Sequence, residues 1–217
     1  MSRPILYSFR RCPYAMRARL AVQSAGVTCE LREILLRDKA PEFLAASAKG
    51  TVPVIVTQDG ATLEESFEIM HWALTANDPE RWLHPGFGNL ESAVSLIKTA
   101  DGDFKHNLDR YKYASRFDTG ESTKARDRAA DFLAGLDGRL TENSYLFGNR
   151  ICIADMAIAP FVRQFASVDR DWFDALPLPR LHRWLEDFLN SQRFASVMQK
   201  YPKWRSGDPV TLFPERP

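Results

Sequence analysis

The sequence predicts a mixed α/β domain, a linker and an all-helical domain, in that order. Residues 1–76 alternate between short apolar runs and helical patterns, in the order strand, helix, strand, helix, hairpin and helix. Residues 77–89 are rich in proline and glycine and show no periodicity, which is typical of a linker. Residues 90–217 keep helical spacing and lack strand signals, so we expect them to fold as helices.

The first half of the α/β domain contains two strands and two helices. An apolar and aromatic run at residues 4–9 predicts the first strand. Pro13 suits the first position of a helix, where its missing N–H removes no hydrogen bond, and the helical pattern lasts until Gly26. Apolar and polar residues alternate at 27–35, which predicts the second strand, and residues 41–48 predict a short helix that opens with a proline.

A hairpin and a helix complete the α/β domain. The β-branched run at 52–56 and the short run at 61–63 are separated by an Asp-Gly turn signal, and helical spacing follows at residues 66–74. In the second domain, helical spacing marks residues 90–117, 122–140, 153–166 and 181–197.

Composition excludes several classes of function. The net charge is +1 with no long run of one sign, so we expect no nucleic-acid partner. No stretch is long and apolar enough for a membrane span or a signal peptide, so we expect no membrane association and a cytoplasmic location. Three cysteines at wide spacings argue against a disulfide framework, and four scattered histidines predict no metal site.

Cys12 is the strongest candidate for chemistry. It follows the first predicted strand and stands at the start of the helix that opens with Pro13. The N–H groups and the dipole at a helix N-terminus favour an anion, so this thiol should ionise more easily than an ordinary one, and Arg10, Arg11 and Arg17 strengthen the bias. Because the thiolate is the nucleophile in disulfide exchange, the position predicts a redox or transferase cysteine.

Four segments resemble those of one protein family. Residues 12–15, Cys-Pro-Tyr-Ala, resemble the glutaredoxin active-site motif with its second cysteine replaced by alanine, and are similar to the Cys-Pro-Phe-Ala of omega-class glutathione transferases. Residues 50–54, Gly-Thr-Val-Pro-Val, look like the loop that carries the cis-proline of the thioredoxin fold. Glu65 and Ser66 look like the motif that holds the γ-glutamyl end of glutathione, and residues 148–155 resemble the helix-capping segment of the helical domain.

The resemblance implies the glutathione transferase fold, with a thioredoxin-like N-terminal domain and an all-α C-terminal domain. It also implies glutathione as cosubstrate, a homodimer, Cys12 as the catalytic residue, and no metal. The implied glutathione contacts are Lys39, Val52, Pro53, Glu65 and Ser66, with Lys39 placed to bind the glycyl carboxylate.

The chemistry of these residues agrees with such a site. A cis Val52–Pro53 bond would turn the Val52 backbone outward to hydrogen-bond an extended peptide, although the sequence leaves the isomer open. Ser66 is expected to cap the helix that follows, and with the N–H groups of that helix it can accept a carboxylate. Glu65 can pair with the neighbouring ammonium of the γ-glutamyl group.

Two other cysteines differ from Cys12 in their surroundings. Cys152 stands where the family usually places serine or threonine, so we expect the cap that complements Asp155 to be missing or replaced by a weak thiol. Cys29 lies in a predicted strand, where no helix N-terminus stabilises a thiolate, and is expected to be a small core residue.

These observations favour a thioltransferase or reductase that works through one thiol, because position 15 holds alanine. Two alternatives stay open: conjugation or isomerisation of a small electrophile, for which Tyr7 or Ser8 could donate a hydrogen bond to the glutathione thiolate, and a binding or regulatory protein without catalysis. The second substrate is expected against the helical domain, where the aromatic candidates are Tyr111, Tyr113, Phe117 and Trp172.

Overall fold

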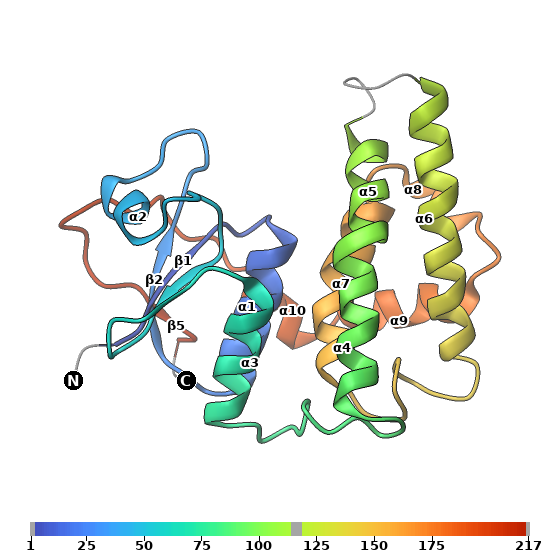
Figure 1. The fold of residues 1–217 in the computed structure, drawn as a ribbon, viewed down its shortest axis with the longest axis horizontal. Coiled ribbons are helices and arrows are strands. Elements are labelled where there is room, and N and C mark those ends of the chain that lie inside the picture. Colours follow the sequence, from blue (N-terminus) through green and yellow to red (C-terminus); the bar gives the residue numbers. More distant parts are fainter. Residues whose placement is uncertain (1–2, 114–118, 216–217) are drawn as a thin grey trace. The chain divides into compact units, whose positions relative to one another are not determined.

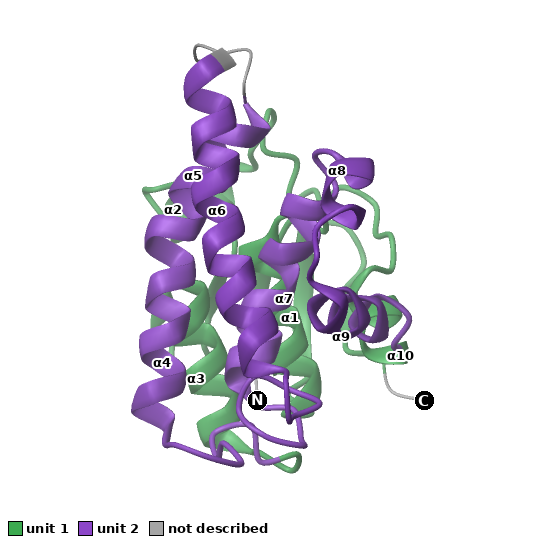
Figure 2. Ribbon diagram, turned by 90° about the vertical axis from the view of Figure 1, so that its right-hand side faces the viewer, with its two compact units in different colours: residues 1–80, 192–217 green, residues 81–191 purple. Residues whose placement is uncertain are grey.

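The computed structural model describes residues 3–113 and 119–215 and divides the chain into two compact units, coloured separately in Figure 2. Unit 1 contains residues 1–80 and 192–217, and unit 2 contains residues 81–191. Residues 192–217, expected in the helical domain, group with unit 1 in the structure.

A mixed sheet forms the centre of unit 1. Its strand order is β4-β3-β1-β2-β5. The central strand is β1 (Ile5–Ser8). It pairs in parallel with β2 (Cys29–Glu33) and antiparallel with β3 (Val54–Val56). β3 in turn pairs antiparallel with β4 (Thr62–Leu63). The two parallel strands are joined through a helix, as parallel neighbours require. This is the predicted α/β arrangement.

Helices cover both faces of this sheet (Figure 1). α1 (Pro13–Ser24) begins at Pro13 as predicted and is followed by Gly26, whose φ of 67° suits the left-handed position after a helix. α1 packs beside α3 (Ser66–Ala76) on one face, and α2 (Pro41–Ala46) lies on the other.

The C-terminal segment returns to the sheet of unit 1. α10 (Gln192–Val197) packs near α1, and β5 (Leu212–Phe213) pairs antiparallel with β2. The Trp204 N–H also donates to the Glu33 carbonyl over 2.9 Å. The sequence does not predict β5, because the strand is short, has no turn signal linking it to a neighbouring strand, and pairs with β2 far away in the chain.

Unit 2 is helical, as predicted. The helices α4 (Leu90–Thr99) and α5 (Lys105–Lys112) are joined by a π-helical turn at Ala100–Phe104, and α6 (Thr119–Arg139) runs beside α5 (Figure 1). The remaining helices are α7 (Ile153–Ala166), α8 (Arg170–Asp174) and α9 (Pro179–Leu189). The predicted helix over 181–197 is therefore two helices, α9 and α10, interrupted at Asn190 and Ser191.

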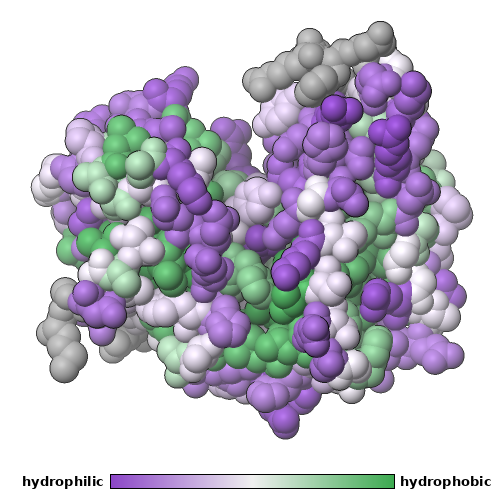
Figure 3. Space-filling view, viewed as in Figure 1, coloured by the Kyte–Doolittle hydropathy of each residue, from purple (hydrophilic) through white to green (hydrophobic). Residues whose placement is uncertain are grey.

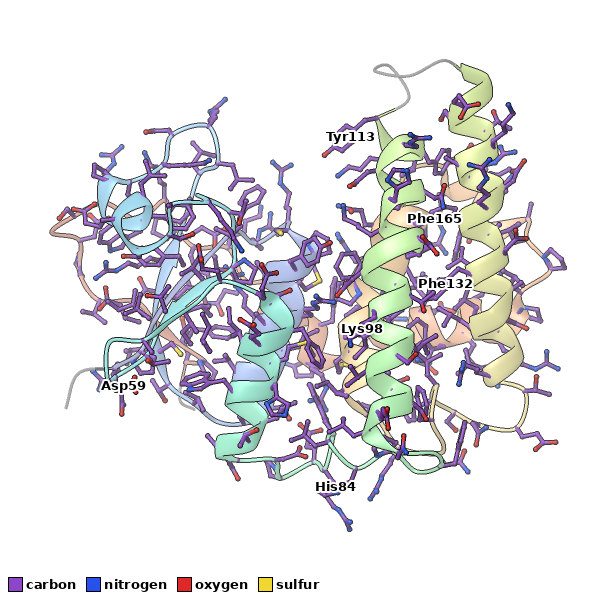
Figure 4. All side chains as sticks on the ribbon, viewed as in Figure 1. Asp59, His84, Lys98, Tyr113, Phe132 and Phe165 are labelled. Carbon is purple, nitrogen blue, oxygen red and sulfur yellow. The ribbon has the colours of Figure 1, made fainter. Side chains whose placement is uncertain are left out.

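Aromatic side chains fill the interior of unit 2. The Phe104 ring lies 4.8 Å from Phe132 and 5.8 Å from Phe165, and Figure 4 shows Phe132 and Phe165 among the helices. Hydrophilic residues cover the upper ends of α5 and α6 on the face drawn in Figure 3. Across the described residues, none of the helices has the length and apolar character that a membrane crossing requires.

Candidate functional site

Cys12 occupies the N-cap position of α1, as the sequence analysis expects. Its backbone is extended, with φ of −75° and ψ of 123°, and its N–H donates to the Phe9 carbonyl over 3.0 Å. The side chain is partly exposed, and its Sγ lies 3.6 Å from the Val52 carbonyl oxygen. The fold therefore brings together two predicted site residues that are forty positions apart in the chain.

The segment before β3 carries three features of the predicted site. The Val52–Pro53 peptide bond is cis, which answers the question that the sequence leaves open. Gly50 has a φ of 58°, and a Cβ added there would lie 3.1 Å from the Lys39 Nζ. The positive φ favours glycine at this position, and the Lys39 side chain lies over it. The exposed Lys39 ammonium thus lies beside Gly50, which is two residues before Val52 in the chain.

Glu65 and Ser66 lie at the start of α3, but in roles that differ from the predicted cap. Glu65 takes the N-cap position without a side-chain cap hydrogen bond, and Ser66 is the first helical residue. The buried Ser66 Oγ accepts a hydrogen bond from Arg17 Nε over 3.0 Å, so α3 is tied to α1 at this point. Exposed Glu65 pairs with Lys49 over 2.8 Å. The expectation that Ser66 caps α3 is wrong, because Glu65 takes the N-cap position and Ser66 is already inside the first turn.

The sequence names Arg17 only as a charge near Cys12, and it does not predict the bond of Arg17 to Ser66 or the pairing of Lys49 with Glu65. Arg17 is only 2% exposed although it is charged, and it stands in a helix whose neighbouring residues are apolar. A charge within an apolar helical pattern is the signal that could have identified it, since buried charges need a partner. Lys49 gives no such signal, because exposed lysines are ordinary in loops.

The two alternative hydroxyl donors, Tyr7 and Ser8, are buried in unit 1. Tyr7 is 3% exposed, and its hydroxyl accepts a hydrogen bond from Arg32 over 2.8 Å. Ser8 has no exposed surface, and its Oγ finds no hydrogen-bond partner among the described residues. The Tyr7 hydroxyl is thus engaged by Arg32, and the Ser8 hydroxyl is enclosed.

Cys29 and Cys152 have no exposed surface, and none of the three cysteines forms a disulfide within the described chain. Burial raises the pKa of the Cys29 thiol to about 12. Burial also raises the pKa of the Cys152 thiol, and the neighbouring Asp155 carboxylate raises it further. Both thiols stay protonated near neutral pH, so neither can act as a nucleophile in the folded protein.

Asp155 organises the start of α7. Its carboxylate accepts hydrogen bonds from the N–H groups of Cys152 (2.9 Å) and Leu146 (2.9 Å) and from the Trp184 indole (3.0 Å). Burial raises the pKa of Asp155, and these donors lower it. The thiol of Cys152 completes a capping box with the Asp155 backbone, so of the two expected outcomes the structure shows the second, in which the thiol replaces the usual hydroxyl.

The aromatic candidates for the second substrate differ in their surroundings. Tyr111 packs against Phe165, with ring centroids 5.3 Å apart, and Trp172 lies 6.0 Å from Phe165. Tyr113 is 39% exposed, and Phe117 lies outside the described residues. Tyr111 and Trp172 thus belong to an aromatic cluster inside unit 2. Across the described chain, no group of three or more His, Cys, Asp and Glu side chains could hold a metal ion.

Two family models match the chain. The glutathione S-transferase N-terminal domain matches residues 6–82, and the glutathione S-transferase C-terminal domain matches residues 105–187. Both models describe the same family, and together they extend over well more than half of the sequence. The first match contains every predicted site residue, from Cys12 to Ser66.

Curated relatives and solved structures agree with these matches. The chain is 26% identical to a probable maleylacetoacetate isomerase of Caenorhabditis elegans, over 90% of the chain and 92% of the relative. It is 23% identical to elongation factor 1-gamma 3 of Oryza sativa subsp. japonica over 86% of the chain, but it spans only about half of that protein, 49%. A glutathione transferase family member from Pseudomonas fluorescens pf-5, crystallised with two glutathione molecules, has the same fold, with a TM-score of 0.76, 19% identity and coverage of 91% and 92%.

Proposed function

Because the chain belongs to the glutathione S-transferase family, we propose that it is a glutathione-dependent thioltransferase in which Cys12 is the nucleophile. One observation carries the proposal. Of the three cysteines, only Cys12 combines partial exposure with a helix N-terminus, and its Sγ lies 3.6 Å from the carbonyl of Val52, next to cis-Pro53. The two alternative hydroxyl donors, Tyr7 and Ser8, are less suited to contact the glutathione thiolate, since Arg32 already bonds the Tyr7 hydroxyl and Ser8 has no exposed surface.

The reaction takes two disulfide exchanges. The Cys12 thiolate attacks the glutathione sulfur of a mixed disulfide, the S–S bond breaks, and the other thiol departs as a thiolate that takes up a proton. A second glutathione thiolate then attacks the sulfur of the bound glutathione, which restores the Cys12 thiolate and yields glutathione disulfide. One thiol suffices, since position 15 is alanine and the other two cysteines are buried.

The remaining residues of the proposed site bind glutathione along the surface of unit 1. The Val52 backbone would pair with the cysteinyl residue of glutathione, in the manner of an added β-strand. Lys39 would bind the glycyl carboxylate, and its ammonium is already positioned over Gly50. The start of α3 offers N–H groups and the Ser66 hydroxyl to the γ-glutamyl carboxylate, and Glu65 faces the ammonium. Two charges of glutathione would thus meet an opposite charge, and the γ-glutamyl carboxylate would meet hydrogen-bond donors.

A panel of activities tests the proposal. Disulfide reduction, dehydroascorbate reduction, aryl halide conjugation and cis-trans isomerisation would be compared for the parent protein and for Cys12→Ser. We expect disulfide reduction in the parent and a loss of at least about a thousand-fold in Cys12→Ser, because a hydroxyl cannot carry a mixed disulfide. Glutathione should still bind to the variant. Unchanged disulfide reduction by Cys12→Ser would contradict the proposal. Conjugation without disulfide reduction in the parent would favour the alternative of a conjugating enzyme.

A non-catalytic role is the rival from another class, since elongation factor 1-gamma relatives share this part of the chain. Binding to immobilised glutathione without any turnover in the panel would support it. The homodimer that the resemblance implies also stays a proposal. Sedimentation at micromolar concentration that gives only the 24.7 kDa species would contradict it.

A further inference from the structure

A concave pocket of about 320 Å³ lies beside the loop that leads to Cys12 in unit 1. Three segments line it: residues 9–11 before the thiol, residues 33–35 at the end of β2, and the C-terminal residues 200, 201 and 203. The volume suits a small molecule or one part of a larger ligand. None of the predicted glutathione contacts lines this pocket.

The pocket is strongly cationic, although the chain as a whole is nearly neutral with a net charge of +1. Its lining includes four positive side chains: Arg10, Arg11, Lys200 and Lys203. Lys203 also forms an ion pair with Asp38, which is exposed and does not line the pocket. Such a concentration of one sign in a hollow attracts ligands of the opposite sign.

The single carboxylate of the lining, Glu33, is already engaged. Its Oε1 accepts the Arg10 backbone N–H over 2.6 Å, and its Oε2 pairs with the fully buried Arg19. Glu33 therefore offers little repulsion to an incoming anion, because its charge is compensated from the interior. The arrangement leaves the pocket with an excess of positive charge.

The pocket and the thiol are next to each other in one loop, the segment between β1 and α1. Arg11 is the residue directly before Cys12, and the Cys12 N–H bonds back to the Phe9 carbonyl, which folds the loop tightly. Phe9, Ile34 and Cys12 also pack in one apolar cluster. Cys12 itself does not line the pocket, but the residue before it does, so the thiol and the pocket lining are consecutive in one loop.

We propose that this pocket receives the half of the disulfide substrate that leaves, and that it selects small thiols bearing a carboxylate. The inference rests on the thioltransferase function proposed above. When the Cys12 thiolate attacks the glutathione sulfur, the S–S bond breaks and its electron pair departs with the other sulfur. The cationic side chains stabilise that departing thiolate as well as the carboxylate attached to it, until the thiolate takes up a proton.

The C-terminal segment supplies half of these cations. It is held on the sheet by the bond from the Trp204 N–H to the Glu33 carbonyl, by the bond from the Leu31 N–H to the Thr211 carbonyl (2.8 Å), and by the pairing of β5 with β2. Arg10 also contacts this segment, with its guanidinium 3.4 Å from the Met198 carbonyl oxygen. The preference for anionic thiols therefore depends on residues nearly two hundred positions from Cys12, held in place by backbone pairing.

Three mixed disulfides of glutathione test the proposal: those with 3-mercaptopropionate (anionic), 2-mercaptoethanol (neutral) and cysteamine (cationic). Each kcat/KM is divided by the rate of uncatalysed exchange of the same disulfide with glutathione, which removes differences in the acidity of the leaving thiol. We expect the order anionic, neutral, cationic, with steps of about five-fold at low salt that shrink as ionic strength rises.

Lys200→Glu should reduce the anionic-to-neutral ratio to about one or below. Arg128→Gln, which changes an exposed charge on α6 of unit 2, is the control and should leave the ratio unchanged. Equal normalised rates for the three disulfides in the parent, or an unchanged ratio in Lys200→Glu, would overturn the inference while Cys12-dependent turnover persists. Loss of the Cys12 dependence itself would instead overturn the proposed function.

Discussion

Two cysteines of this chain occupy the same position at the start of a helix and have opposite surroundings. Cys12 is the N-cap residue of α1, and Cys152 is the N-cap residue of α7. Cys12 is partly exposed, beside the Val52 carbonyl, whereas Cys152 has no exposed surface and lies beside the Asp155 carboxylate. The helix dipole favours a thiolate at both places. A helix N-terminus is therefore expected to create a reactive thiol only where burial and neighbouring negative charge do not oppose ionisation.

The largest expected difference between the two is in alkylation. At pH 7.5, iodoacetamide should modify Cys12 at least about a hundred-fold faster than Cys152 or Cys29, because burial raises the pKa of both other thiols and shields them from the reagent. Mass spectrometry of peptides from the native protein, taken over time, measures the three rates. Equal modification rates for Cys12 and Cys152 would show that the two helix starts do not differ in thiol reactivity. Unfolding in urea is the control, because it should make the modification rates of the three cysteines similar.

Asp155→Ala tests what the buried helix start contributes to stability. The change leaves two backbone N–H groups and the Trp184 indole without their buried acceptor, so we expect the free energy of unfolding to fall by about 3 kcal/mol. Urea denaturation monitored by circular dichroism measures it. Asp59→Ala, at the exposed hairpin turn labelled in Figure 4, should lower stability far less. If both variants lost the same small amount of unfolding free energy, Asp155 would not stabilise the start of α7.

The pH dependence of stability separates the thiols further. Burial raises the pKa of Cys152 in the folded state, while the unfolded thiol titrates near its ordinary value of about 8.5. Stability contributed by this thiol is therefore complete below about pH 8.5 and is lost as the pH rises above it, by up to about 1.4 kcal/mol per pH unit. Cys152→Ala should show a shallower decline between pH 8.5 and 10 in urea titrations, whereas Cys12→Ala should keep a slope closer to the parent's. If stability declined equally with pH in the parent and both variants, the Cys152 thiol would not have a raised pKa in the folded state.

A third helix start, that of α3, provides the smallest expected effect. Ser66→Ala should weaken glutathione binding about five-fold, because it removes one hydrogen bond to the carboxylate, worth about 1 kcal/mol. It should also lower the melting temperature, since the Ser66 Oγ is the acceptor for Arg17. Calorimetric titration with glutathione measures the affinity.

The matched control for Ser66 is a true side-chain cap. The Asn89 Oδ1 accepts the Ser92 N–H over 2.8 Å at the start of α4. Asn89→Ala should lower stability by about 1 kcal/mol and leave glutathione affinity unchanged. If Ser66→Ala bound glutathione as tightly as the parent, Ser66 would not be a glutathione contact.

Much of the fold follows from local patterns in the sequence. Pro13 begins α1 and Gly26 follows it, because ring geometry and positive φ act within a few residues. The boundaries of α7 also agree with the prediction, since its apolar pattern is long and continuous. The position of Cys12 at a helix start needs no tertiary information for the same reason.

Only the tertiary structure decided which of these residues meet and how deeply they are buried. The contact of Cys12 with Val52, the bond of Arg17 to Ser66 and the return of β5 to β2 join segments far apart in the chain. The difference between Cys12 and Cys152 is of the same kind: both stand at helix starts, and burial arises from packing against residues that the local sequence does not contain. Short-range sterics and hydrogen bonding determine where helices begin, whereas solvent exclusion, which controls the ionisation of a thiol, is a property of the folded whole.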